Sequence, residues 1–252
     1  MPPFFTLKSP QTGTEYLIFV HAPEPAREPG PWPAIVFMDG DNLFDIAVEA
    51  YREGRAVGEI PPVLLVGIGY GAGFGKPRNM RLRDYTATAM ATEKGSGGAE
   101  AFHAFLAGTL WTELAVRYPL REDARGLAGH SLGSLLVLHG LFRPRPFFTH
   151  FLAGAPSIWW DDRTVLAEVS RLRERQDALP ARLYLGVGAG DTPSMTGDLA
   201  LLERQLGTKP FTGLRITSER IEGRNHYDVL PDEFRRGLRA LFGRNQGGAK
   251  AQ

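Results

Sequence analysis

Short runs of consecutive apolar residues recur along the chain, and several of them end at a glycine or an aspartate. A run of this kind, without polar alternation, is typical of a strand that is buried on both faces of a parallel sheet. We therefore expect strands within the following ranges: 16–21, 34–38, 63–66, 127–128, 151–153, 183–185 and, in a more polar form, 214–221.

Between these runs, apolar residues recur at the spacing of an α-helix. Residues 100–118 and 230–242 each carry such a stripe, and residues 135–141 form a short segment that is apolar almost throughout. Strands that alternate with helices in this way predict an α/β fold, with a mostly parallel central sheet and helices on both faces.

The main irregular stretch, residues 67–99, follows a predicted buried strand and is rich in glycine, arginine and small residues. Ligands bind at the carboxyl ends of strands in α/β sheets, and long loops in compact domains usually serve a function. We expect this stretch to form one wall of a site. It contains a literal G-x-G-x-x-[GA] match at 67–72, but no helix opens there to hold a pyrophosphate, so we exclude a dinucleotide motif.

Composition indicates one folded domain over residues 1–252, with a frayed tail at 246–252. The hydrophobic share is 43% and the charged share 23%, which is ordinary for a globular protein. The chain has no cysteine, which excludes disulfides, thiolate metal sites and a cysteine nucleophile. Its net charge of +1, without a charge run, does not indicate a nucleic-acid or membrane partner. We expect no metal and no cofactor, and the oligomeric state stays open.

No targeting signal is visible in the sequence. The first residues lack the charged and apolar regions of a signal peptide, and no stretch approaches the ~20 apolar residues of a membrane helix. We therefore expect a cytoplasmic protein, or a periplasmic one if the sequence has been trimmed.

The strongest chemical signal is the sequence Gly129-His130-Ser131-Leu132-Gly133, which lies between a predicted strand and an apolar helix. Strand, sharp turn and helix form the context of a nucleophile elbow, in which small residues flank a serine on a strained turn. The helix N-terminus behind the serine favours developing negative charge. We expect Ser131 to be a nucleophile.

A serine nucleophile on such an elbow needs an acid and a base, which follow it in the order Ser, Asp or Glu, His. His226, in a polar loop before the last helix, is the one histidine after His150, so it is the expected base. Asp191 is the first carboxylate after the predicted strand at 183–185 and is the expected acid, with Asp198 as the alternative. The other histidines are interpreted as structural.

A tetrahedral oxyanion needs two backbone donors. One is expected to be the N–H of Leu132, directly after the serine. The other is expected to be the N–H of Asp41, in the loop Asp39-Gly40-Asp41 that follows the strand at 34–38. We expect a kink at Gly40 to turn the Asp41 N–H toward the site.

Together with these motifs, further stretches of the chain resemble the bacterial serine esterase family of the α/β-hydrolase superfamily, in the branch of siderophore trilactone esterases and esterase D. The resemblance covers nearly the whole chain. It implies an α/β-hydrolase fold without a large separate cap domain, a nucleophile at Ser131, a base at His226 and an oxyanion donor near Gly40. The stretches that carry it are 36–44, 66–70, 81–86, 98–102, 129–133, 155–160 and 225–226.

Some positions depart from the family's pattern. Ser134 stands where family members usually carry a second glycine after the elbow, and Tyr227 follows the histidine where small residues are common. The loop at 188–191 reads Gly-Ala-Gly-Asp, where relatives often read Gly-Glu-x-Glu. Some relatives work with a weak acid or a serine–histidine dyad. The acid therefore stays open between Asp191, Asp198 and a dyad.

The residues around the expected site leave the substrate open. Arg81 and Arg83 lie in the wall segment, Trp159 and Trp160 follow a strand on the site side of the sheet, and His130 lies in the elbow. As substrate-binding residues they would suit an anionic, aromatic ester such as a catecholate siderophore, through ion pairing and stacking. In the opposing interpretation, the arginines form a structural ion-pair corner and the tryptophans shape the rim.

The sequence thus predicts a serine hydrolase that cleaves small-molecule carboxylic esters through an acyl-enzyme intermediate, with siderophore lactones and other small or aromatic esters among the candidate substrates. Two alternatives use the same scaffold differently. One is an acyltransferase that passes the acyl group to an alcohol, and the other is a non-catalytic ligand-binding protein. Analogy at the level of the fold does not separate them.

Overall fold

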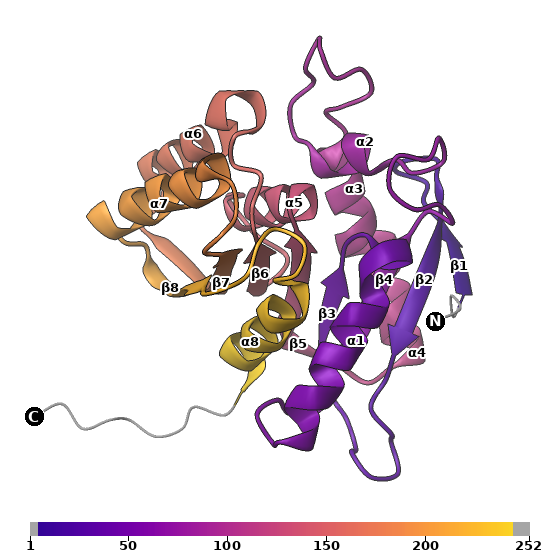
Figure 1. The fold of residues 1–252 in the computed structure, drawn as a ribbon. Coiled ribbons are helices and arrows are strands. Elements are labelled where there is room, and N and C mark those ends of the chain that lie inside the picture. The colour runs from indigo at the N-terminus through magenta and orange to yellow at the C-terminus, as the bar shows by residue number, and fades with distance from the viewer. Residues whose placement is uncertain (1–4, 244–252) are drawn as a thin grey trace, which may run out of the picture.

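The computed structural model describes residues 5–243, so the predicted tail at 246–252 lies outside the described residues. An eight-stranded sheet runs through it in the order β1-β2-β4-β3-β5-β6-β7-β8 (Figure 1). β2 pairs antiparallel with β1 and β4, whereas the pairs from β4 across to β8 are parallel. The strands are β1 (Phe5–Lys8), β2 (Glu15–His21), β3 (Trp32–Phe37), β4 (Leu64–Gly69), β5 (Leu120–His130), β6 (His150–Gly154), β7 (Ala178–Gly188) and β8 (Thr212–Ile221).

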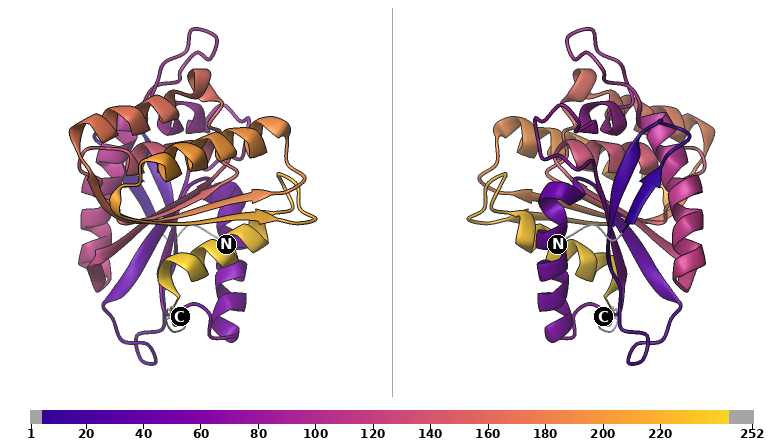
Figure 2. Two further views of the ribbon diagram at one scale, coloured as in Figure 1. Left: turned by 90° about the vertical axis from the view of Figure 1, so that its left-hand side faces the viewer. Right: turned by 90° about the vertical axis from the view of Figure 1, so that its right-hand side faces the viewer.

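Helices cover both faces of this sheet, as the two side views show (Figure 2). α1 and α8 pack against each other on one face, and α3 to α7 lie on the other. Among the described residues, no helix is both long and apolar enough to cross a bilayer. The helices are α1 (Gly40–Ala56), α2 (Arg81–Tyr85), α3 (Ala99–Phe105), the π-helical η1 (Leu106–Leu110), α4 (Trp111–Arg117), α5 (Leu132–Leu141), α6 (Trp160–Arg175), α7 (Pro193–Thr208) and α8 (Leu230–Phe242).

The α/β prediction is confirmed, and each expected strand is present, although most run longer than their apolar cores. The helix expected over 100–118 is interrupted by η1, where the backbone widens to i→i+5 spacing around Gly108. Helix α1 is not among the predicted elements, although its buried residues recur at helical spacing, as at Leu43, Phe44, Ala47 and Val48.

The stretch 67–99 is less irregular than the sequence indicates. β4 continues through Gly69, because its glycines at 67 and 69 leave room for the side chains of Phe44 and Phe19. α2 forms a short helix at the centre of the stretch. The segment between α2 and α3 projects at the top of Figure 1.

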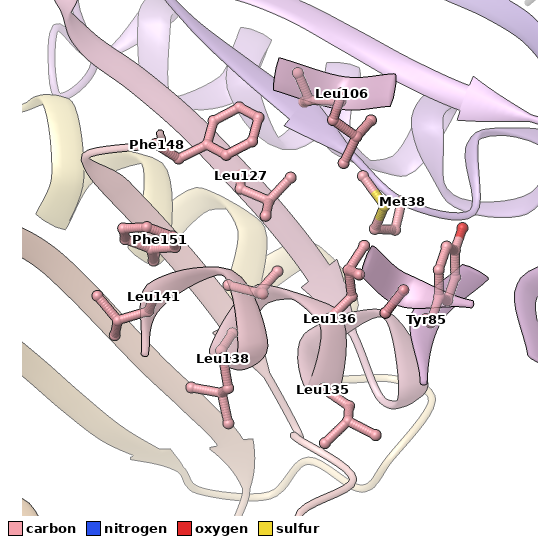
Figure 3. Close-up of a cluster of buried hydrophobic side chains, with 14 of the residues drawn as sticks. Met38, Tyr85, Leu106, Leu127, Leu135, Leu136, Leu138, Leu141, Phe148 and Phe151 are labelled. Carbon is pink, nitrogen blue, oxygen red and sulfur yellow. The ribbon is translucent and has the colours of Figure 1, made fainter. Parts of the chain in front are cut away.

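Helix α5 anchors the middle of the fold because it is buried on every side. Figure 3 shows its leucines between Leu127 of β5 and Phe151 of β6 on one side and Tyr85 of α2 on another. The leucines at 135, 136, 138 and 141 are all 0% exposed, and burying each contributes roughly 2 kcal/mol. A helix held this firmly fixes the position of its own N-terminus, where the elbow lies.

Candidate active site

Ser131 lies in the turn between β5 and α5 with φ 56° and ψ −120°, a backbone conformation that residues other than glycine rarely adopt. Its N–H donates to the carbonyl of Gly154 on β6, at 2.9 Å. A Cβ on Gly129 would come 2.4 Å from the carbonyl carbon and oxygen of Gly133, so only glycine fits there. The sharp strand–turn–helix expected from the sequence is therefore present, with the serine at its apex.

Ser134 explains one departure from the family's pattern. Its Oγ lies 2.6 Å from the carbonyl oxygen of Gly129 and 2.5 Å from that of Gly154. The single hydroxyl hydrogen is shared between these two carbonyl acceptors, one on the elbow and one on the neighbouring strand. A second glycine at this position would leave both without that donor, so the serine braces the turn.

A second hydroxyl lies beside the nucleophile candidate, and the sequence did not reveal it. The Oγ of Ser157, which is 1% exposed, lies 3.5 Å from the Oγ of Ser131. The Ser157 N–H donates to the Ser131 carbonyl at 3.3 Å. In the sequence, residues 155–160 carry only the family resemblance, because nothing local to them indicates a contact with the elbow.

His226 and Asp191 lie together on two joined loops. Nδ1 of His226 and Oδ2 of Asp191 are 2.7 Å apart, with the imidazole side chain 20% exposed and the carboxylate 0% exposed. Backbone bonds from Ala189 to the Ile221 carbonyl and from Gly190 to the Arg224 carbonyl, both 2.9 Å, hold the loops in register. An aspartate in this place fixes the imidazole tautomer and stabilises an imidazolium.

Asp198, the alternative acid, has a different partner. It is buried on α7, and its Oδ1 accepts a hydrogen bond from Nε of Arg163 at 2.7 Å. Arg163 ends a left-handed stretch at 161–163, with φ of 43°, 49° and 62°. The ion pair therefore ties this strained turn to α7.

The corner between β3 and α1 differs in detail from the expectation. The left-handed residue is Asp39, with φ 57°, and Gly40 already begins the helix. Gly40 is needed for another reason: a Cβ there would come 2.9 Å from the backbone of Ile68. The Asp41 carboxylate accepts the N–H groups of Tyr70 and Gly71 at 2.5 and 3.1 Å, which fastens the corner to the end of β4.

The expected oxyanion donors both lie in the first turn of a helix. Leu132 begins α5, and Asp41 is the second residue of α1. N–H groups in a first turn have no intrahelical acceptor and carry the positive end of the helix dipole. The two helix starts are neighbours, since a Cβ on Gly133 would lie 3.4 Å from Oδ2 of Asp39.

The model of the family described as putative esterase matches residues 9–229. The chain belongs to this esterase family. It is 29% identical over 242 residues to the ferri-bacillibactin esterase BesA of Bacillus subtilis, covering 89% of this chain and 83% of that protein. The solved structure of the BES protein from Bacillus cereus superposes with a TM-score of 0.84 at 27% identity, covering 94% of this chain and 93% of the other.

A fungal structure is similar as well. The siderophore hydrolase EstB from Aspergillus nidulans superposes with a TM-score of 0.79 at 25% identity, over 95% of this chain and 94% of that one. The chain is therefore a serine ester hydrolase with the α/β-hydrolase fold.

In this esterase, both arginines of the wall segment have internal partners. Nε and Nη2 of Arg81 donate to the two carboxylate oxygens of Asp39, at 2.9 and 3.0 Å. Burial lowers the pKa of Arg81, but the charge and hydrogen bonds of Asp39, together with Tyr85 and Tyr70, more than offset this, so the pKa is raised. The Asp39 N–H also donates to the hydroxyl of Tyr85 at 2.9 Å, so Asp39 links the corner to α2.

Arg83 lies in a second corner on the same helix. Its Nε donates to the buried Asp84 at 2.7 Å, and its Nη2 donates to Thr14 at 2.8 Å. The hydroxyls of Tyr16 and Tyr70 donate to the same carboxylate, at 2.8 and 3.0 Å. Both oxygens of the Asp84 carboxylate therefore accept hydrogen bonds. These contacts support the interpretation of Arg83 as part of a structural ion-pair corner.

The remaining substrate-binding candidates of the esterase differ in exposure. Trp159 is 45% exposed, whereas Trp160 is 3% exposed and donates from Nε1 to Thr88 at 3.2 Å. His130 is 6% exposed and turns inward, with Nδ1 3.1 Å from Oε1 of Glu233 on α8. Of these three, only Trp159 offers a ring to solvent, and the structure gives the other two internal partners.

Proposed function

We propose that this esterase hydrolyses the ester bonds of siderophores, with Ser131 as the nucleophile, His226 as the base and Asp191 as the acid. The observation that carries the proposal is the 2.7 Å contact between His226 and Asp191, at the same end of the sheet as the strained turn of Ser131. Support for the substrate class comes from the relatives, one a ferri-bacillibactin esterase and one a siderophore hydrolase.

In the proposed reaction, the Oγ of Ser131 attacks the ester carbonyl while Nε2 of His226 accepts its proton. The N–H groups of Leu132 and Asp41 hold the oxyanion. The imidazolium, stabilised by Asp191, then protonates the leaving alcohol as the C–O bond breaks and an acyl group remains on the serine. A water that gives its proton to His226 hydrolyses this acyl-enzyme and restores the hydroxyl.

Three exposed aromatic rings next to site residues favour an aromatic substrate. Trp159 (45% exposed) follows Ser157 by two positions, and Tyr227 (80% exposed) directly follows His226. The ring centroid of Phe74 (46% exposed) lies 4.8 Å from the guanidinium carbon of Arg81. Large exposed aromatic side chains beside a site are typical of binding surfaces for flat ligands.

The first experiment is labelling with a fluorophosphonate probe, read by intact mass and peptide mapping. We expect one adduct on Ser131 and none in the Ser131→Ala variant. A folded wild-type protein that forms no adduct would contradict the assignment of the nucleophile and favour a ligand-binding protein.

The second experiment compares hydrolysis of an aromatic siderophore trilactone with hydrolysis of an aliphatic ester. Trp159→Ala is expected to raise KM for the aromatic substrate by roughly fivefold, since stacking on one ring is worth about 1 kcal/mol. Val116→Ala is the matched control, because Val116 is 79% exposed and lies on α4. Equal KM changes in the two variants would refute the aromatic subsite.

A third experiment tests the arginines. If Arg81→Ala and Arg83→Ala change kinetics on anionic and neutral esters equally, neither guanidinium binds an anionic substrate.

A fourth experiment tests the acyl acceptor. When an alcohol is added to the hydrolysis reaction, we expect the free carboxylic acid to remain the product. A new ester of the added alcohol would favour the acyltransferase alternative.

The cytoplasmic location and the single-domain organisation stay predictions.

A further inference from the structure

The carboxylate of Glu233 is buried in a place where the helix otherwise presents apolar side chains. Glu233 lies in the first turn of α8 and is 0% exposed, next to Phe234, which is 1% exposed. Its Oε1 lies 3.1 Å from Nδ1 of His130, while Oε2 and the His130 Nε2 have no partner among the described residues. Burying a carboxylate away from water costs free energy, so a buried glutamate at this position is expected to have a specific role.

Glycines of two strands make room for this carboxylate. A Cβ on Gly154 of β6 would lie 1.6 Å from Oε1 and 1.9 Å from Cδ of Glu233. A Cβ on Gly186 of β7 would lie 3.1 Å from its Cγ. The sheet is thus shaped around the acid, which packs directly on the backbone of β6, the strand whose Gly154 carbonyl also accepts the Ser131 N–H.

The pair reaches the proposed base. The ring of His130 lies 4.7 Å from the ring of His226, centroid to centroid, at an interplanar angle of 50°. His130 directly precedes Ser131, and Glu233 follows His226 by seven positions along the chain. The Glu233–His130 contact therefore joins the elbow to the helix that ends the His226 loop, the yellow loop that precedes α8 in Figure 1.

We propose that Glu233 and His130 are positioning residues that hold the His226 ring through the contact between the two imidazole rings and, through the Glu233 charge, favour the His226 imidazolium that forms during serine attack. In this arrangement neutral His130 donates its Nδ1–H to the Glu233 carboxylate, so the pair carries one negative charge. The inference rests on the proposed function, since it assigns a role around the proposed base.

Other charged and titratable groups face this pair and the base. Asp191 contacts His226 directly, and the phenol ring of Tyr227 packs edge-on against it. On β7, Tyr184 lies near Glu233, and burial together with the charges of Glu219 and Glu233 raises its pKa. Arg224 in the His226 loop donates from Nε to Oδ2 of Asp232 on α8, at 2.7 Å. Of these groups, Tyr184 alone interacts with the charge that Glu233→Gln removes.

The test compares Glu233→Gln with Glu168→Gln. Glu168 also pairs with a buried histidine, His139, at 2.5 Å, but on α6 and α5 away from the base. Both variants lose one carboxylate–imidazole pair, so a general effect on folding appears in both. Glu233→Asp keeps the charge and serves as the conservative rescue.

Two readouts are expected to separate Glu233→Gln from the control. In the pH profile of kcat/KM, the acidic limb moves to lower pH by about half a unit, and kcat falls roughly tenfold with KM nearly unchanged. In histidine nitrogen NMR, the titration midpoint of His226 moves in the same direction, since removing a negative charge disfavours the imidazolium. Glu233→Asp keeps the wild-type midpoint.

The NMR readout needs no turnover, so it distinguishes the failure of this inference from that of the proposed function. Identical His226 titrations in wild type and Glu233→Gln would overturn the inference even if esterase activity is found. If Glu233→Gln does not fold, the wild-type spectrum decides. A neutral His130 with its proton on Nδ1 between about pH 6 and pH 8 supports the inference. A doubly protonated His130 over that range overturns it, because the pair then carries no net charge.

Discussion

Replacing Asp191 by asparagine removes one charge from a contact that the structure defines closely. The carboxylate lies 2.7 Å from Nδ1 of His226 and is 0% exposed, so no water competes with the imidazole for it. Asparagine keeps the shape, but its amide offers a hydrogen where the carboxylate offers a lone pair. The imidazole then turns to the tautomer whose Nε2 carries a hydrogen, and that nitrogen cannot accept the serine proton.

The expected loss is set by this wrong tautomer. For a buried aspartate in such a triad it amounts to roughly 10⁴-fold in kcat, or about 5.5 kcal/mol of transition-state stabilisation. Steady-state hydrolysis of a p-nitrophenyl ester measures it, with circular dichroism melts to show that the variant is folded. Asp198→Asn is the control, because Asp198 bonds to Arg163 and is expected to keep kcat within about threefold of wild type.

Two outcomes would refute this reasoning. If Asp191→Asn keeps kcat within about threefold, a serine–histidine dyad operates and the 2.7 Å contact is only structural. If Asp198→Asn lowers kcat instead, the acid is on α7 and the loops must rearrange when substrate binds.

Two further predictions follow from the packing and from a buried histidine. Gly129→Ala places a Cβ 2.4 Å from the Gly133 carbonyl, so we expect roughly 100-fold slower fluorophosphonate labelling and a stability loss of about 1–3 kcal/mol, whereas Gly197→Ala, with nothing within 4 Å, leaves labelling unchanged. Burial, aided by the charge of Arg143, lowers the pKa of His103 from 6.5 to about 3. The unfolded chain then binds the proton more readily, so the contribution of neutral His103 to stability is full above pH 6.5 and falls by about 1.4 kcal/mol per pH unit between pH 6.5 and about pH 3. Urea unfolding at pH 7 and pH 5 measures this, and we expect the free energy of unfolding to fall less between the two pH values in His103→Gln than in wild type. An equal fall in both proteins would contradict the assignment of this pH dependence to His103.

Local patterns predicted the sheet and the elbow well. A strand buried on both faces needs a run of apolar residues, and a strained serine turn needs small residues on either side, so each leaves its mark within a few positions. The π-helical break at Leu106–Leu110 was not predicted, because a wider turn keeps nearly the same apolar stripe. The kink at the β3–α1 corner was placed on Gly40, whereas the left-handed residue is Asp39, whose side chain is held by Arg81 from a distant helix.

By itself, then, the sequence determined the alternation of strands and helices and the elbow around Ser131, and it singled out the histidine that we propose as the base, since these depend on residue types at short spacing. Only the tertiary structure decided which partner each buried carboxylate has. Asp191 and Asp198 are chemically alike and both follow β7, yet one reaches His226 across 35 positions and the other reaches Arg163. Glu233 reaches His130 across 103 positions. Such pairings depend on how loops and helices converge in space, and a side chain's own neighbours in the chain carry no record of that.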